Sequence, residues 1–106
     1  MTFDSPVYMA WIRTQECVVC AKLWTMGVRI QFFALPGGGA IEAAHVGDHG
    51  KGEKCSDLET LPLCRWHHQV APDAHHVLGP KFWAHHGLNR GALIEQHQQD
   101  FYVRAA

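Results

Sequence analysis

The chain has 106 residues, of which 47% are hydrophobic and 18% are charged, and its formal net charge at pH 7 is −1. Such a composition excludes a disordered chain, and a length below about 150 residues leaves room for one core, so we expect a single domain over residues 1–106. The near-neutral charge excludes a strong overall attraction to nucleic acid. A DNA partner would therefore have to be held by local cations or by a bound divalent metal.

The first residues lack the pattern of a secretion signal, and no stretch approaches the roughly 18 consecutive apolar residues that span a bilayer. We therefore expect a cytoplasmic protein without a membrane partner. Thiols stay reduced in that compartment. The four cysteines, at positions 17, 20, 55 and 64, are accordingly expected to bind metal or to act in redox chemistry rather than to form structural disulfides.

A short helix is the first predicted element. Ser5 suits the N-cap and Pro6 suits the first helical position, where a missing backbone N–H leaves no bond unmade. The apolar pattern continues at helical spacing to about Thr14. The Cys17–Cys20 pair that follows predicts a tight knuckle, and no helix start is evident there.

Two strands are predicted on either side of the strongest turn signal, Pro36–Gly39. Residues 28–32 alternate apolar and polar side chains, and residues 41–46 have strand composition after the turn. A hairpin is the simplest way to join them. The glycine-rich polar residues 47–57 then predict a loop.

The second half of the chain is predicted to be mainly helical. A third apolar run over residues 58–63 contains a proline, which disfavours a central position in a sheet. A helical pattern starts at Arg65 and is broken near Pro72. Asn89 can cap a final helix that runs to about residue 104 and carries apolar side chains on one face.

The spacing of Cys17-x-x-Cys20 and Cys64-x-x-His67 is typical of a tetrahedral zinc site, because each pair places two donors on one turn. Four protein ligands would close the site, so this zinc would be structural and would stabilise a small core. Two alternatives remain. Cys17 and Cys20 could form a redox pair, or Cys55 could replace His67 as the fourth ligand.

Four further histidines are candidates for chemistry once the zinc ligands are set aside: His45, His68, His75 and His76. A helix that directs His67 to zinc turns the next residue by about 100° around its axis. His68 should therefore face away from the zinc and be available to another partner.

This order of motifs resembles the HNH (His-Me finger) nuclease superfamily. The residues that carry the resemblance are Cys17-Val-Val-Cys20, Ala44-His45 and Leu63-Cys64-Arg65-Trp66-His67-His68. More narrowly, the chain is similar over about residues 8–88 to phage recombination-enhancement nucleases and their small prophage relatives. The similar segments are Glu42-Ala-Ala-His45, Gly52 to Asp57, Leu61-Pro-Leu-Cys-Arg-x-His-His68 and Phe82-Trp83-x-x-His-Gly87.

The resemblance implies a small zinc-stabilised ββα-metal domain of the α+β class with flanking N- and C-terminal helices. Its core would cover about residues 15–88, and its C-terminal helix about residues 89–104. It also implies a metal-dependent DNA endonuclease of phage or prophage origin, linked to DNA recombination or processing. DNA and a recombinase filament would then be its partners.

Within that family the site residues would have distinct roles. His45 would be the general base, which suits an imidazole because its pKa is close to neutral. His68, together with His76 or His75, would hold a divalent metal such as Mg²⁺ against the scissile phosphate. Asp57 would orient His45 or ligate the metal.

Ala44 stands where the superfamily usually has an Asp or His metal ligand. Either the downstream histidine doublet supplies that ligand or metal binding is weakened. Ala44 and the near-neutral charge motivate an alternative function, a non-catalytic zinc-stabilised module that binds DNA or protein. The remaining histidines of the second half, His85, His86 and His97, are expected to pack or to form hydrogen bonds rather than to bind metal.

Overall fold

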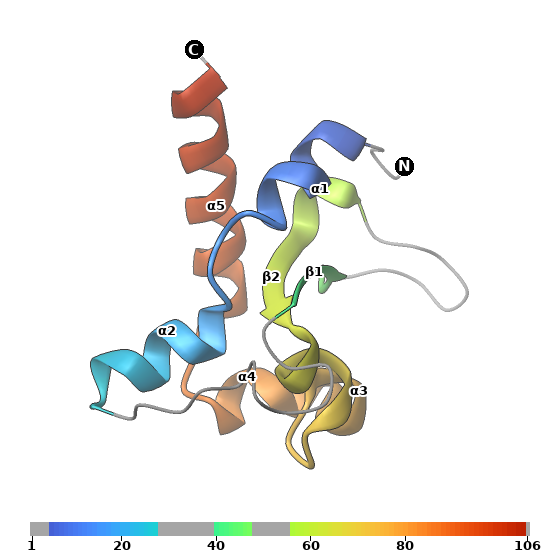
Figure 1. The fold of residues 1–106 in the computed structure, drawn as a ribbon, viewed down its shortest axis with the longest axis vertical. Helices are drawn as coiled ribbons and strands as arrows, with labels where there is room; N and C mark the ends of the chain where they lie inside the picture. Colours follow the sequence, from blue (N-terminus) through green and yellow to red (C-terminus); the bar gives the residue numbers. More distant parts are fainter. Residues whose placement is uncertain (1–4, 28–39, 48–55, 106) are drawn as a thin grey trace.

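The structure is a computed structural model that describes residues 5–27, 40–47 and 56–105. These residues form a small α+β domain (Figure 1). In chain order the elements are α1 (Pro6–Ile12), α2 (Val18–Thr25), β1 (Ile41–His45), the 3-10 turn η2 (Asp57–Glu59), β2 (Thr60–Cys64), the π-helical turn η3 (Trp66–Val70), α3 (His75–Leu78), the 3-10 turn η4 (Gly79–Lys81), α4 (Phe82–His85) and α5 (Arg90–Ala105). Among the described residues no helix is long and apolar enough to cross a membrane.

The sheet consists of β1 and β2, which pair antiparallel with Ile41 opposite Cys64 and His45 opposite Thr60. This register puts His45 at one end of the sheet and Cys64 at the other. Side chains alternate along a strand, so Glu42 and Ala44 lie on one face of the sheet and His45 lies on the other. The two ends and the two faces of the sheet therefore carry chemically different side chains, although each strand has only five residues.

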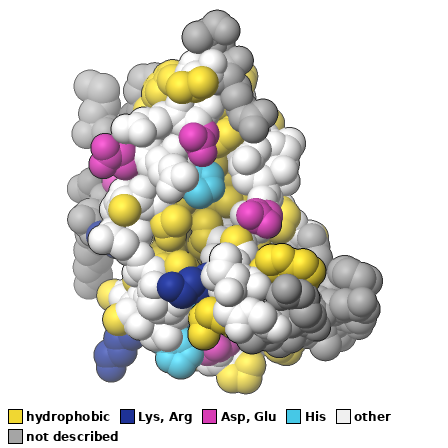
Figure 2. Space-filling model, turned by 90° about the vertical axis from the view of Figure 1, so that its left-hand side faces the viewer, with side chains coloured by type: hydrophobic (Ala, Val, Ile, Leu, Met, Phe, Trp, Pro, Cys, Tyr) yellow, Lys and Arg dark blue, Asp and Glu magenta, His cyan; other side chains and the backbone are white. Residues whose placement is uncertain are grey.

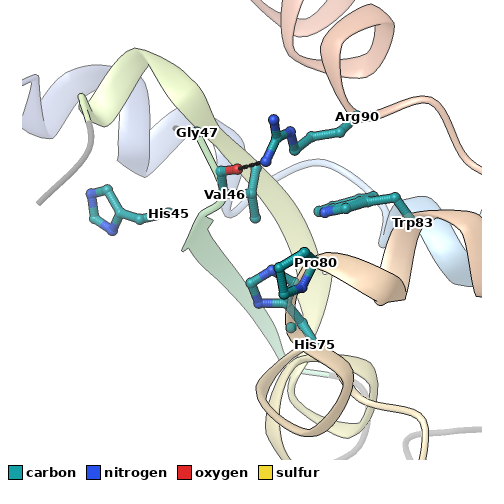
Figure 3. A pocket seen from close by; sticks show the side chains of 8 residues that line it. His45, Val46, Gly47, His75, Pro80, Trp83 and Arg90 are labelled. Atoms are coloured by element: carbon teal, nitrogen blue, oxygen red, sulfur yellow. Dashed lines mark hydrogen bonds between the residues drawn. The ribbon is translucent and has the colours of Figure 1, made fainter. Parts of the chain in front are cut away.

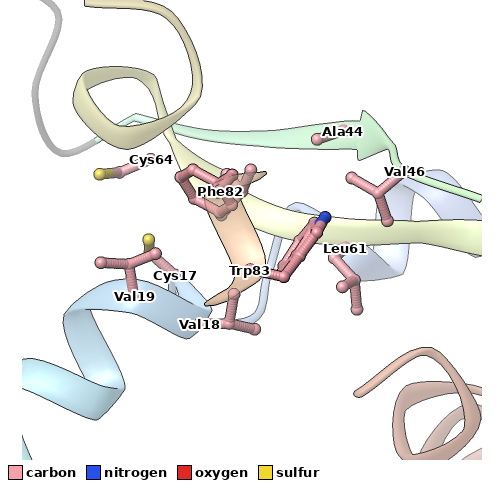
Figure 4. Close-up of a cluster of buried hydrophobic side chains, with 10 residues drawn as sticks. Cys17, Val18, Val19, Ala44, Val46, Leu61, Cys64, Phe82 and Trp83 are labelled. Carbon is pink, nitrogen blue, oxygen red and sulfur yellow. The ribbon is translucent and has the colours of Figure 1, made fainter. Parts of the chain in front are cut away.

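Buried hydrophobic side chains from α2, the two strands and α4 form one core (Figure 4). Its members are Cys17, Val18, Val19, Ala44, Val46, Leu61, Leu63, Cys64, Phe82 and Trp83. Figure 4 shows Cys17 and Cys64 at the edge of this cluster, beside Val19 and Phe82. The cysteines are thus continuous with the apolar core, and an ion bound to them would link α2 to the end of β2.

Helix α1 starts as the sequence predicts. The Ser5 hydroxyl accepts a hydrogen bond from the backbone N–H of Tyr8 at 3.3 Å, and Pro6 opens the helix. The helix packs against both strands, and Tyr8 contacts Phe101 of α5 edge to face with ring centroids 5.0 Å apart. Helix α5 also packs against β2, and Asn89 Oδ1 caps it by accepting from the N–H of Ala92 at 3.0 Å.

The Tyr8 hydroxyl is buried and has no hydrogen-bond partner among the residues that the structure describes. We expect Tyr8→Phe to raise the free energy of unfolding by about 1 kcal/mol, because it removes a desolvated polar group and keeps the ring contacts. Burial, and then the charges of Tyr102 and Asp100, raise the pKa of Tyr8 from 10 to about 12. The unfolded chain therefore loses this proton first, and the wild type should lose stability between pH 10 and 12 more steeply than Tyr8→Phe. Urea unfolding of both proteins across that pH range measures each difference.

The described elements confirm one of the predicted strands and contradict the prediction made at Cys17. The prediction of a knuckle without a helix start at Cys17 is wrong, because Cys17 is the N-cap of α2. The strand over residues 28–32 and the turn Pro36–Gly39 lie outside the described residues, as does nearly all of the predicted loop. The strand predicted over residues 41–46 is confirmed as β1, but its described partner is β2.

Candidate metal centres

Cys17, Cys20, Cys64 and His67 converge at one end of the sheet into a group of four potential metal ligands. Cys20 Sγ lies 3.8 Å from Cys64 Sγ, and His67 Nδ1 lies 3.8, 3.6 and 3.2 Å from the sulfurs of Cys17, Cys20 and Cys64. Zinc bonds of about 2.3 Å to sulfur and about 2.0 Å to nitrogen imply, around a tetrahedral ion, S–S separations of about 3.8 Å and S–N separations of about 3.5 Å. The donor spacing therefore fits a structural metal such as zinc.

Local structure explains why these four side chains meet. Cys17 caps α2 and Cys20 lies in its first turn, whereas Cys64 ends β2 and His67 lies in η3, directly after it. Cys17 does stand at a helix start, as a redox pair would require, but the additional donors from Cys64 and His67 favour metal binding. Cys55, the alternative fourth ligand, lies outside the described residues.

The electrostatics of this group change with the presence of a cation. Hydrogen bonds with Cys17 and Cys64, together with burial, raise the pKa of Cys20, whereas hydrogen bonds with Cys17 and Cys20 lower the pKa of Cys64. Burial alone would lower the pKa of His67, but its hydrogen bonds with Cys17 and Cys64 outweigh burial and raise it to about 9. Without a cation the group thus retains protons that zinc, which binds thiolates and neutral imidazole, would release.

A second group consists of His68, His75 and His76, whose potential ligand atoms all lie within 4.8 Å of one another. The ring centroids of His68 and His76 are 4.5 Å apart. Burial and the neighbouring histidines lower the pKa of His75 to about 4, and burial also lowers the pKa of His68. At neutral pH both rings are therefore uncharged, which is the form that binds metals.

His75 supplies an independent indication that this group fits a cation. Its Nδ1 is buried and has no hydrogen-bond partner among the described residues. A buried polar nitrogen without a partner costs about 1–3 kcal/mol. A divalent transition metal is a partner that three neutral imidazoles would accept. Both members of the doublet belong to the group, with His75 half-buried and His76 exposed.

The adjacent histidines His67 and His68 lie in different groups of potential metal ligands. They share the turn η3, which is a π-helix: the N–H of Ala71 bonds to the carbonyl of Trp66, five residues earlier, at 2.8 Å. Single π-helical turns are rare and are often found at functional sites. Here the turn directs two consecutive imidazoles to two separate groups of ligands.

His45 and Asp57 are in direct contact. His45 Nε2 lies 2.8 Å from Asp57 Oδ1, and the other carboxylate oxygen accepts from the backbone N–H of Ser5 at 2.8 Å. A carboxylate can only accept, so this contact puts the proton on Nε2 and leaves Nδ1 of His45 as an acceptor. Asp57 thus has the orienting contact with His45 that was one of its two expected roles.

His45 and His75 line the same cavity, which has a volume of about 250 Å³ (Figure 3). The other lining residues are Val46, Gly47, Gly79, Pro80, Trp83 and Arg90. Figure 3 shows His45 at the end of β1 with its ring directed toward one side, whereas His75, Pro80, Trp83 and Arg90 lie together on the other side of Val46. Arg90 Nη1 donates to the carbonyl of Val46 at 3.1 Å, which holds its guanidinium at the cavity wall.

Three contributors to these sites were not expected from the sequence: Glu42, Trp83 and Arg90. Glu42 Oε1 lies 2.7 Å from His68 Nδ1, and Trp83 and Arg90 line the cavity. Glu42 lies 26 positions before His68 in the chain, so only the pairing of β1 with β2 brings them together. The arginine opens α5, and its position at the cavity depends on how that helix packs against β2.

The remaining histidines have the contacts expected of them. His86 Nε2 donates to the Asp73 carbonyl at 3.0 Å, and His85 Nε2 lies 3.3 Å from the Asp73 carboxylate. His97 Nδ1 donates to the carbonyl of Leu93 in its own helix at 2.8 Å. Asp73, His85 and His86 are close enough to form a third group of ligands, but the bond from His86 to a backbone carbonyl already occupies its Nε2.

Comparisons of the chain with protein-family models, with curated proteins and with solved structures give no match. The features of the molecule that indicate a function are therefore its two groups of potential metal ligands and its cavity.

Proposed function

We propose that the protein is a metal-dependent DNA endonuclease of the HNH type that hydrolyses phosphodiester bonds at the cavity between His45 and His75. The observation that carries the proposal is that a histidine suited to act as a base and a histidine of the metal-ligand group line one cavity. General-base catalysis and metal-assisted hydrolysis both require the base and the metal to reach one phosphate, and a shared cavity is where such a phosphate would bind. The cysteine-rich group would hold zinc and would have no catalytic role, because all four of its positions are closed by protein.

In the proposed reaction, Nδ1 of His45 takes a proton from a water molecule as the water oxygen bonds to phosphorus. The phosphorus–oxygen bond to the leaving group breaks, and the leaving oxygen takes a proton from solvent. Asp57 keeps His45 in the required tautomer through its 2.8 Å contact with Nε2. A divalent cation held by His68, His75 and His76 would offset the negative charge that develops on the phosphate.

The sheet and the turn after it support a ββα-metal arrangement. β1 and β2 form an antiparallel pair, and η3, which carries His68, follows β2 directly. Ala44 is buried in the core and offers no ligand atom, so the His75–His76 doublet would supply what the superfamily takes from that position. This favours a complete metal site over a weakened one.

Electrostatic attraction to DNA would be local under this proposal. The formal net charge is −1, and on the face seen in Figure 2 acidic, basic and histidine side chains are intermixed around exposed hydrophobic ones. Arg90 brings a permanent positive charge to the cavity wall, where it suits a phosphate oxygen. The sequence resemblance supports DNA as the substrate, recombination or processing as the setting, and a recombinase filament as a partner.

Incubation of the zinc-loaded protein with supercoiled plasmid and with single-stranded DNA tests this proposal. We expect cleavage when Mg²⁺ or Mn²⁺ is added and none when only the structural zinc is present, because the base alone does not offset charge on the phosphate. His85→Ala serves as the matched control, since that imidazole is 52% exposed and belongs to neither the cavity nor the His68 group. A fully zinc-loaded protein that cleaves neither substrate with either metal would favour the alternative, a non-catalytic module that binds DNA or protein.

A further inference from the structure

Glu42 of β1 reaches across to the turn that carries His68. Its Oε1 lies 2.7 Å from His68 Nδ1 and also accepts from Gln69 Nε2 at 2.7 Å. Because a carboxylate can only accept, the proton on the His68 ring lies on Nδ1. The other ring nitrogen, Nε2, is therefore unprotonated and has a lone pair available to a cation.

Two donors from the turn η3 hold the carboxylate in place, because His68 Nδ1 and Gln69 Nε2 both lie 2.7 Å from Oε1 of Glu42. The side chains of Glu42 and His68 are 30% and 14% exposed, so solvent screens their contact only in part. A charged acceptor on Nδ1 also makes the opposite nitrogen a stronger donor to a metal.

We propose that Glu42 is a positioning residue of the second metal site, which fixes the tautomer and the orientation of His68 so that its Nε2 binds a divalent cation. This inference rests on the proposed function only in taking His68, His75 and His76 as the ligands. Carboxylate–histidine–metal triads are the usual means by which proteins orient a histidine ligand. A purely structural role, in which Glu42 ties β1 to η3, predicts the same contact but no effect on metal affinity.

Titration of the zinc-loaded protein with Mn²⁺, with the free ion followed by electron paramagnetic resonance, separates these two roles. We expect Glu42→Ala to weaken Mn²⁺ binding by about 10–100-fold. Glu42→Gln keeps an acceptor without the charge and should show an intermediate loss. Gln69→Ala is the matched control, because it removes the other contact to the same oxygen and should leave the affinity within about twofold.

The tautomer of His68 provides a readout that a structural role would not change. We expect long-range ¹H–¹⁵N spectra to show the proton of His68 on Nδ1 in the wild type and in Gln69→Ala, and a mixture of both tautomers in Glu42→Ala. Zinc content and circular dichroism establish that each variant is folded. Unchanged Mn²⁺ affinity in folded Glu42→Ala overturns the inference, as does a wild type that binds one zinc and no Mn²⁺.

The outcome is distinguishable from failure of the proposed function. A protein that loses Mn²⁺ affinity in Glu42→Ala but cleaves no DNA in any form retains the positioning role and refutes the nuclease. A protein that cleaves DNA with undiminished Mn²⁺ affinity in Glu42→Ala retains the nuclease and refutes the role of Glu42.

Discussion

His67→Ala is expected to abolish cooperative folding at neutral pH. The substitution removes one of four potential metal ligands from a group whose cysteines Cys17 and Cys64 lie at the edge of the core. Structural zinc contributes about 10–16 kcal/mol of apparent folding free energy in small zinc domains. A chain of 106 residues has a net free energy of unfolding of only about 5–15 kcal/mol. Because the free energy contributed by zinc is of the same size or larger, its loss would leave the unfolded state favoured. Zinc content by mass spectrometry and thermal unfolding by circular dichroism measure the effect.

The neighbouring residue gives the matched control for this prediction. His68→Ala removes a contact with Glu42 but no cysteine-group ligand, and should cost only about 1–2 kcal/mol. We therefore expect His68→Ala to keep its zinc and to unfold cooperatively, while losing DNA cleavage. Equal unfolding of both variants would show that the two histidines do not belong to separate sites.

His45→Ala is expected to reduce DNA cleavage by about 10²–10⁴-fold, which is the usual contribution of a general base. His45 lies at the cavity with its Nδ1 available as an acceptor, and the substitution leaves both groups of metal ligands intact. The change leaves the Asp57 carboxylate, which is 5% exposed, with only its bond from the Ser5 N–H among these two contacts, so we expect a folded variant that is less stable by about 1–3 kcal/mol. Single-turnover cleavage rates at saturating Mn²⁺ measure the effect separately from metal binding.

Two controls accompany that rate measurement. His85→Ala should cleave at the wild-type rate, and His45→Ala should bind zinc and Mn²⁺ as the wild type does. Wild-type rates in His45→Ala would remove this residue from the role of base and leave the nuclease without its proposed mechanism.

The cysteine-rich group of Cys17, Cys20, Cys64 and His67 is the part of the site that the sequence predicts best. Its ligands occur in pairs one turn apart, and the only long-range inference needed is that the pairs meet. The separation of His67 from His68 could be predicted for a similar reason, because consecutive residues on a helical turn point in different directions. Ser5 caps α1 and Asn89 caps α5, and both caps could be predicted because each capping residue is adjacent in sequence to its helix.

The contacts that the sequence could not predict all depend on packing between distant segments. Helix α2 begins at Val18, directly after its N-cap residue Cys17, although the two-residue spacing of the cysteines suits a turn as well as a helix. Glu42 reaches His68 only because β1 pairs with β2 in one particular register. Arg90 and Trp83 reach the cavity through the packing of α5 and α4. The spacing of residues within each helix does not predict how the helices pack.

A crystal structure of the protein with zinc, Mn²⁺ and a bound DNA fragment, with anomalous difference maps at both absorption edges, would locate both metals and the phosphate in one experiment. We expect zinc among Cys17, Cys20, Cys64 and His67, and Mn²⁺ among His68, His75 and His76. We also expect one phosphate to contact the Mn²⁺ and to lie within reach of His45 through one water molecule. A single metal at the cysteine group, or a Mn²⁺-bound phosphate more than about 10 Å from His45, would contradict the proposed mechanism.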